Sequence, residues 1–335
     1  MGNAIQWDIG VEPEVTTEYA GTKLGEYYTN PDVRVETEVK ARKKFYELYG
    51  YGSPEVTFVG VSGLFYTCAT VLGAKLFFPE DTSPQVQGRV INDLSDIKKL
   101  KIPKDFASAG LIPHVIEGYE YLKKKSDITG ITPCFGLAKQ SPLGTATVLR
   151  GTEIFYDVVT NPDEMKALLE IVTETAIRII RFEEEFTGKK FESMGMDDDY
   201  GGLFSPDIYE EFNFPYMKRV YDEFGKNSRS VHTETLAKGH LKFLRRLGIT
   251  SYDAWPYNNL TVEDVKEELP DIYFSWNFTT KEILSDTPSQ IKEKFGQYVA
   301  AGAPGMVLDL CARGVPGENI MAFIEVAREI EEKGV

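Results

Sequence analysis

The sequence has few of the features that mark membrane-spanning or disulfide-stabilised proteins. Three cysteines, Cys68, Cys134 and Cys311, are an odd number and lie far apart, which argues against a disulfide scaffold and favours a reducing compartment. No apolar run approaches the roughly 18 residues that a membrane span needs. Residues 1–10 lack the basic-then-apolar pattern of a signal peptide. We therefore expect a cytoplasmic protein with no membrane partner.

Basic residues are also scarce: 37 Lys and Arg stand against 52 Asp and Glu, which gives a net charge of −15. A surface this acidic repels the phosphates of nucleic acids and anionic lipids, so no nucleic-acid partner is expected. No G-x-G-x-x-G follows an expected strand, and no G-x-x-x-x-G-K-[ST] occurs anywhere. The sequence therefore predicts no cradle for nucleotide phosphates.

What the chain does have is a regular alternation of strands and helices over 335 residues, of which 42% are hydrophobic. Short connections repeated this often indicate a parallel sheet. We predict an α/β fold, a TIM (β/α)8 barrel forming a single domain over residues 51–335 with an N-terminal extension over 1–50; an open doubly wound sheet is the alternative. The expected strands are 55–61, 130–134, 191–196, 228–232, 250–254, 272–276 and 305–310, and the clearest helices are 205–224, 235–247, 261–269, 289–301 and 316–333.

Polar and reactive side chains follow several of these strands. In a barrel the carboxyl ends of the strands converge on one face, where chemistry takes place. His232 closes a strand, with Glu234 two residues later, and the triplet Asp197–Asp199 follows another. Three adjacent carboxylates repel one another unless a cation or hydrogen-bond donors lie near. Cys311 ends the last strand, and Arg313 is close enough in sequence to favour its thiolate.

Aromatic side chains also stand at or just past strand ends. They can pack in the core or form a stacking wall for a planar substrate. We expect them to bind substrate, and Phe65 and Tyr66, which follow the first expected strand, can belong to the same wall. The predicted substrate-binding residues are Tyr200, Trp255, Tyr257 and Trp276.

The C-terminal half carries short segments that resemble the uroporphyrinogen decarboxylase superfamily and, within it, the cobalamin-dependent methyltransferases. These segments are SPDIYEEF at 205–212, PYMKR at 215–219, LGI at 247–249 and CARGVPGENI at 311–320. The resemblance covers residues 190–335 well and implies an α/β barrel. The decarboxylase itself is not expected, because residues 1–50 lack the Arg-rich stretch with which that enzyme grips propionates.

The resemblance also implies a zinc site. The methyltransferase branch holds zinc with a His-x-Cys pair and a Cys on the last strand end; here His232 and Cys311 are kept, and Glu234 replaces the first Cys. The corrinoid methyltransferases that demethylate aryl ethers resemble Glu-x14-Glu-x20-His. Glu211 and His232 keep the second spacing, and Met196 stands at the upstream Glu. The expected zinc ligands are Glu211, His232 and Cys311, with Asp198 and Glu234 as catalytic groups.

Replacing a thiolate ligand by a carboxylate leaves a harder, more Lewis-acidic metal, which suits an ether oxygen. We therefore expect a Zn2+-dependent methyltransferase that moves a methyl group from a methoxylated aromatic to the Co(I) of a separate corrinoid protein. The cobalamin must arrive on that partner, because no Asp-x-His-x-x-Gly motif occurs. The alternatives are methanol, methylamine or methylthiol as donor, and transfer in reverse to a thiol or tetrahydrofolate. A further alternative is a metal-free barrel that binds a ligand or a corrinoid partner without turnover.

Overall fold

The computed structural model describes residues 5–62 and 64–333, in which parallel β-strands alternate with α-helices. The chain divides into two compact units. Unit 1 comprises the residues up to Thr57, residues 78–83 and the residues from Tyr252 onward; unit 2 comprises 58–77 and 84–251.

The strands of unit 1 form a parallel sheet. Their order is β1 (Gln6–Val11), β10 (Gly305–Leu310), β9 (Tyr273–Asn277) and β8 (Ser251–Ala254). All six residues of β1 pair with β10, from Gln6 opposite Gly305 to Val11 opposite Leu310. The sequence pattern predicts no strand in this region. The segment predicted as an N-terminal extension therefore supplies one strand of the sheet and the helices that follow it.

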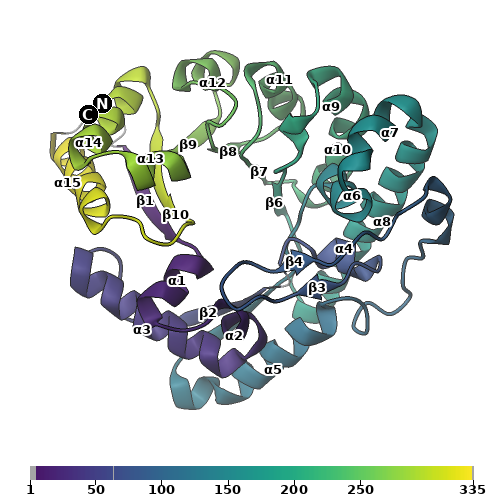
Figure 1. Ribbon diagram of the computed structural model, residues 1–335, viewed down its shortest axis with the longest axis horizontal. Helices are drawn as coiled ribbons and strands as arrows, with labels where there is room; N and C mark the ends of the chain where they lie inside the picture. Colours follow the sequence, from purple (N-terminus) through teal and green to yellow (C-terminus); the bar gives the residue numbers. More distant parts are fainter. Residues whose placement is uncertain (1–4, 63, 334–335) are drawn as a thin grey trace. The chain divides into compact units, whose positions relative to one another are not determined.

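In the sequence of unit 1, helices follow each of these strands. Threonines cap three of them: Thr261, Thr279 and Thr287 each accept a hydrogen bond from a backbone N–H of the first turn. α14 and α15 lie side by side, with the rings of Phe295 and Phe323 5.1 Å apart (Figure 1). The helices are α1 (Pro13–Ala20), α2 (Leu24–Thr29), α3 (Pro31–Tyr49), α12 (Val262–Glu268), α13 (Thr280–Ser285), α14 (Pro288–Ala301) and α15 (Gly317–Lys333).

Unit 2 contains two parallel strand pairs and a short antiparallel pair. β2 (Phe58–Ser62) pairs with β5 (Thr132–Gly136), and β6 (Ser193–Asp197) pairs with β7 (Ser228–Thr233). The segment after β5 runs beside the end of β6, because the Ser141 backbone N–H donates to the Asp197 carbonyl at 2.7 Å. The antiparallel pair is β3 (Leu76–Phe77) with β4 (Gln85–Val86).

The helix expected over residues 205–224 is two helices in the structure, α9 (Pro206–Phe212) and α10 (Phe214–Phe224). Pro215 has no N–H to donate to the carbonyl of Glu211, so the helical ladder breaks and Asn213 leaves the helical conformation. The remaining helices are α4 (Thr67–Val71), α5 (Ile112–Thr129), α6 (Pro142–Arg150), α7 (Ile154–Thr160), α8 (Pro162–Thr187) and α11 (Lys238–Arg246), with 3-10 turns η1 (Leu94–Lys99), η2 (Gly151–Glu153) and η3 (Gly201–Leu203).

Side chains alternate between the two faces of the strands, as the pleat requires. One face is apolar and buried, as shown by Met194 and Met196 in β6 and Leu308 and Leu310 in β10. The other face carries small and polar residues, which are Gly195, Asp197, Ser230 and His232 in unit 2 and Asp253, Ser275, Asn277 and Asp309 in unit 1. In each unit this polar face is where side chains can meet a ligand. Within the described residues, no helix is both long enough and apolar enough to cross a membrane.

Candidate functional site

The ends of β6 and β7 bring an imidazole and a carboxylate together in unit 2. His232 Nε2 lies 3.6 Å from Asp199 Oδ1. The side chain of His232 is 29% exposed and that of Asp199 is 30% exposed. The two loops are joined beside this pair, because the Asp198 N–H donates to the His232 carbonyl at 2.8 Å. The structure therefore places Asp199 next to His232, whereas the sequence pattern predicts Asp198 as the catalytic carboxylate.

Asp199 sits in an electrostatically unusual environment. Burial raises the pKa of Asp199 to about 7; His232 opposes this shift, and the negative charges of Asp197 and Glu234 add to it. Asp199 Oδ1 is buried and has no hydrogen-bond partner among the described residues. A buried acceptor without a partner is rare, and a cation, a substrate group or an ordered water is what satisfies it. A shifted carboxyl beside an imidazole is typical of a functional site.

Asp198 has a different role. Its side chain is fully buried, and Oδ2 accepts hydrogen bonds from the Tyr209 hydroxyl at 3.0 Å and Asn213 Nδ2 at 2.8 Å. Burial raises the pKa of Asp198, although these donors oppose the shift. The carboxyl therefore joins the end of β6 to α9 and to the break before α10. The predicted catalytic role of Asp198 stays a prediction; its contacts are those of a positioning residue.

Two glycines let the β6 and β7 loops pack against each other. The Gly202 N–H donates to Thr235 Oγ1, and that hydroxyl donates to the Asp199 carbonyl, both at 3.0 Å. A Cβ at Gly202 would overlap the Thr235 carbonyl, and a Cβ at Gly201 would overlap the Asp198 carboxyl. The backbone approach that positions Asp199 thus depends on glycine at both places.

The Gly202→Ala substitution is expected to lower the free energy of unfolding by about 1–3 kcal/mol, because the added methyl group forces the two loops apart. Thermal unfolding measures the loss. Gly296→Ala in α14 is the control, since a Cβ there meets nothing within 4 Å and alanine favours the helix. Equal melting temperatures for the two variants would contradict this account.

Tyrosines lie close to the same carboxyl. Burial raises the pKa of Tyr66, and the charge of Asp199 adds to the shift. Burial likewise raises the pKa of Tyr200, with smaller contributions from Tyr66 and Asp199. Both rings are partly exposed, so they can contact a bound molecule. Tyr200 was predicted to bind substrate, and its position beside Asp199 is compatible with that role.

In unit 1, Cys311 follows β10 and takes part in a chain of hydroxyl contacts. Its Sγ lies 3.1 Å from Thr280 Oγ1, which in turn lies 3.2 Å from the Tyr257 hydroxyl. The ring of Tyr257 stacks on Trp255 with centroids 6.1 Å apart. Thr280 therefore fixes the position of the sulfur, and Tyr257 fixes the position of Thr280.

Two of the predicted substrate-binding residues are buried. Trp255 and Trp276 are each only 2% exposed, and Trp276 packs on Tyr298 of α14, whereas Tyr257 is 44% exposed. The tryptophans therefore belong to the core of unit 1, and Tyr257 is the accessible member of the predicted set in that unit. The expectation that Arg313 favours the Cys311 thiolate is also not supported, because its guanidinium donates to the Glu14 carbonyl and the Thr17 hydroxyl of α1.

The carboxylates named as ligand and catalytic group lie in different surroundings. Glu211 is on α9, with half of its side chain exposed, and its Oε1 lies 2.5 Å from Lys166 Nζ on α8. Glu234 is close enough to Asp199 for its charge to raise the pKa of that group. Within the described part of the chain, no three His, Cys, Asp or Glu side chains are arranged to hold a metal ion. The ligand set Glu211, His232 and Cys311 therefore stays a prediction.

The residues present nevertheless fit a divalent cation at His232. An imidazole nitrogen and a buried carboxylate oxygen without a hydrogen-bond partner are both ligands that Zn2+ accepts. His240, by contrast, is structural, as its ring contacts the Phe204 carbonyl at 2.9 Å and accepts from the Ala237 N–H.

From the sequence, Asp199 is predicted only as one member of the triplet Asp197–Asp199, and Thr280 is not predicted at all. The period of two along a strand places Asp199 on the face of Gly195 and Asp197, and it places Asp198 on the buried face of Met194 and Met196. Extending that alternation past the strand end was the available signal for Asp199. Thr280 has no such signal, because its contact with Cys311 joins residues 31 positions apart.

Comparison with known proteins gives a consistent result. Residues 11–330 match the family described as Uroporphyrinogen decarboxylase (URO-D). Curated relatives include the uroporphyrinogen decarboxylases of Aliivibrio salmonicida and Vibrio cholerae, each 24% identical, which align with 79% of this chain and 77% of their own lengths. A solved structure, a methyltransferase from Methanosarcina mazei, matches 98% of this chain and 95% of its own with a TM-score of 0.71 and 17% identity. These matches confirm the predicted α/β-barrel fold class.

Proposed function

We propose that this chain, which belongs to the uroporphyrinogen decarboxylase family, is a methyltransferase. It transfers a methyl group at a zinc site built around His232. The donor is a methoxylated aromatic, and the acceptor is the Co(I) corrinoid of a separate protein. The observation that carries the proposal is the pair His232 and Asp199, whose oxygen is buried without a hydrogen-bond partner. The likeness of the fold to a methyltransferase supports the same reaction class.

The chemistry of this pair argues against decarboxylation. Uroporphyrinogen carries many carboxylates, and a site for it needs positive charge. The ends of β6 and β7 instead carry Asp197, Asp199 and Glu234. The charges of Asp197 and Glu234 are close enough to raise the pKa of Asp199. The net charge of −15 disfavours the same substrate at longer range.

The residues of the chain have distinct tasks in the proposed reaction. His232 and Asp199 hold the ion, with Cys311 as a further expected ligand. When bound, zinc supplies Lewis acidity that stabilises the oxygen from which the methyl group departs. Tyr66 and Tyr200 contact the aromatic ring, and Asp198 fixes the loop that carries Asp199.

The electrons balance without any further reagent. The methyl carbon receives an electron pair from the Co(I) centre of the partner protein as its bond to the ether oxygen breaks. The electrons of that bond stay on the oxygen, which takes a proton, and a phenol leaves. The corrinoid partner must therefore reach the polar face on which His232 lies.

Methyl transfer from a methoxyphenol to free Co(I) cobalamin, followed by absorbance, tests the proposal together with the zinc content of the purified protein. We expect one zinc per chain and transfer that stops when the metal is removed. Full activity of zinc-free protein would overturn the proposal. Methanol, methylamine and methylthiol as donors, and a thiol or tetrahydrofolate as acceptor from methylcobalamin, test the alternatives in the same assay. Release of CO2 from uroporphyrinogen would support the decarboxylase instead.

The Thr280→Val substitution is expected to weaken zinc binding about tenfold if Cys311 is a ligand, because it removes the hydroxyl that positions the sulfur while keeping the side-chain shape. Competition with a chromophoric chelator measures the affinity. Tyr257→Phe, which frees Thr280, should give a smaller loss in the same direction. Thr160→Val, at an exposed hydroxyl in α7, is the control. Unchanged affinity in both Thr280→Val and Tyr257→Phe would exclude this role.

A further inference from the structure

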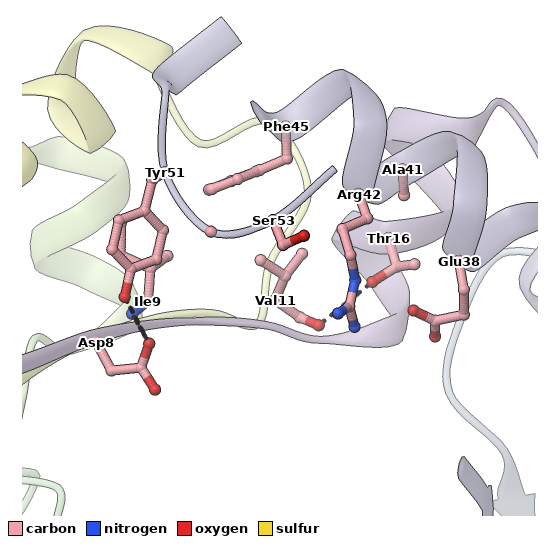
Figure 2. A pocket seen from close by; sticks show the side chains of 11 residues that line it. Asp8, Ile9, Val11, Thr16, Glu38, Ala41, Arg42, Phe45, Tyr51 and Ser53 are labelled. Atoms are coloured by element: carbon pink, nitrogen blue, oxygen red, sulfur yellow. Dashed lines mark hydrogen bonds between the residues drawn. The ribbon is translucent and has the colours of Figure 1, made fainter. Parts of the chain in front are cut away.

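Unit 1 contains a pocket of about 410 Å³ that has no part in the proposed methyl transfer. It lies between β1, α1, α3 and the turn at residues 51–53, so all of its walls belong to one unit (Figure 2). Pockets that hold small ligands are typically of this size and combine apolar walls with a few fixed polar groups. Both features are present here.

The apolar part of the wall comes from two elements. Ile9 and Val11 face the pocket from β1, and Ala41 and Phe45 face it from successive turns of α3 (Figure 2). Ile9, Ala41 and Phe45 are at most 7% exposed, so they are held in place by the core. This wall offers contact to a methyl-rich or branched aliphatic group.

The polar part of the wall carries charges of both signs. Asp8 and Glu38 supply two carboxylates, and Arg42, one helical turn after Glu38, supplies a guanidinium (Figure 2). The Tyr51 hydroxyl donates to Asp8 Oδ1 at 2.7 Å, and the Tyr27 hydroxyl donates to Glu38 Oε1 at 2.6 Å. Each carboxylate is thus oriented by a phenol and keeps further lone pairs that can accept from a ligand.

We propose that this pocket binds a zwitterion of the amino-acid type, with an ammonium group toward Asp8, a carboxylate toward Arg42, and an aliphatic side chain on the apolar wall. A ligand with only a negative charge would be repelled by the two carboxylates, and a ligand with only a positive charge would be repelled by the guanidinium. A zwitterion of short length places each charge beside its opposite. Arg42 is suited to the carboxylate end, because its planar guanidinium matches a carboxylate with two parallel hydrogen bonds.

Titration calorimetry with three matched molecules tests the charge requirement. L-Leucine carries both charges, 4-methylpentanoate lacks the ammonium group, and 3-methylbutylamine lacks the carboxylate. Glycine betaine tests a zwitterion whose cation cannot donate a hydrogen bond. We expect at least one of the two zwitterions to bind at least tenfold more tightly than either singly charged molecule. Absence of binding by both zwitterions, or equal binding by a singly charged molecule, would overturn the proposal.

Variants of the two charged residues place the site. Arg42→Gln and Asp8→Asn should each weaken the binding of that zwitterion at least tenfold. Lys43→Gln and Glu36→Gln remove one charge of each sign from exposed positions of α3 and should leave binding unchanged. Ala41→Leu, which fills the pocket without changing charge, should also weaken binding, and thermal unfolding shows which variants remain folded. Equal losses in the exposed controls would overturn the proposal, and retained methyl transfer in Arg42→Gln would separate it from the proposed function.

Discussion

Replacing His232 by alanine is expected to remove the bound zinc and to slow methyl transfer at least about 100-fold. The metal supplies several kcal/mol of stabilisation to the departing oxygen, and each 1.36 kcal/mol is worth a factor of ten in rate. The fold should survive, because the imidazole lies on the polar face of β7 and is 29% exposed. Loss of function without loss of structure is therefore the expected result.

Elemental analysis of zinc, the rate of methyl transfer to Co(I) cobalamin and far-ultraviolet circular dichroism measure the three effects of His232→Ala separately. His114→Ala is the matched control, since it removes an exposed histidine of α5 and should change none of them. A His232→Ala protein that keeps one zinc per chain and its rate would remove the basis of the proposed function. Loss of both helical signal and zinc would point to a structural role of His232 instead.

The period of the hydrophobic pattern predicts most of the fold. The seven strands expected from the sequence all appear, with ends that differ by at most three residues, as for 55–61 against Phe58–Ser62. β1 was not expected, because its sequence QWDIGV mixes two polar side chains and a glycine into six residues. Only its pairing with β10, almost 300 residues later, makes it a strand. Such a pairing is invisible to a local pattern.

The candidate site shows the same limit at the level of single residues. His232 and Tyr200 were named because they follow strands, and the structure places both of them close to Asp199. Whether a residue just past a strand end points toward the ligand or into the core depends on the alternation of side chains along the strand. The sequence shows this alternation only as a pattern with a period of two. Trp255 and Trp276 illustrate this, because they follow the same rule of position and yet are buried. The contact of Arg313 with α1 joins opposite ends of the chain, and nothing local indicates it.

The Asp198→Ala substitution is expected to lower the free energy of unfolding by about 2–6 kcal/mol, the largest stability loss that we expect at this site. The carboxyl is completely buried, and it accepts from Tyr209 and Asn213. Removing it leaves a hydroxyl and an amide in the core without their acceptor, and each such group costs about 1–3 kcal/mol. The end of β6, and with it Asp199, then loses its attachment to α9.

Asp198→Asn separates the hydrogen bonds from the charge, because it keeps the shape and one acceptor oxygen. Burial raises the pKa of Asp198 in the folded protein above its value in the unfolded chain. The stability that this group contributes is therefore present below its pKa in the unfolded chain, about 3.9, and decreases as the pH rises toward the folded value. The stability difference between wild type and Asp198→Asn should accordingly narrow as the pH rises. Urea unfolding from pH 4 to pH 8 measures it, and an equal, pH-independent loss in the Asn and Ala variants would show that Asp198 does not act as a buried acceptor.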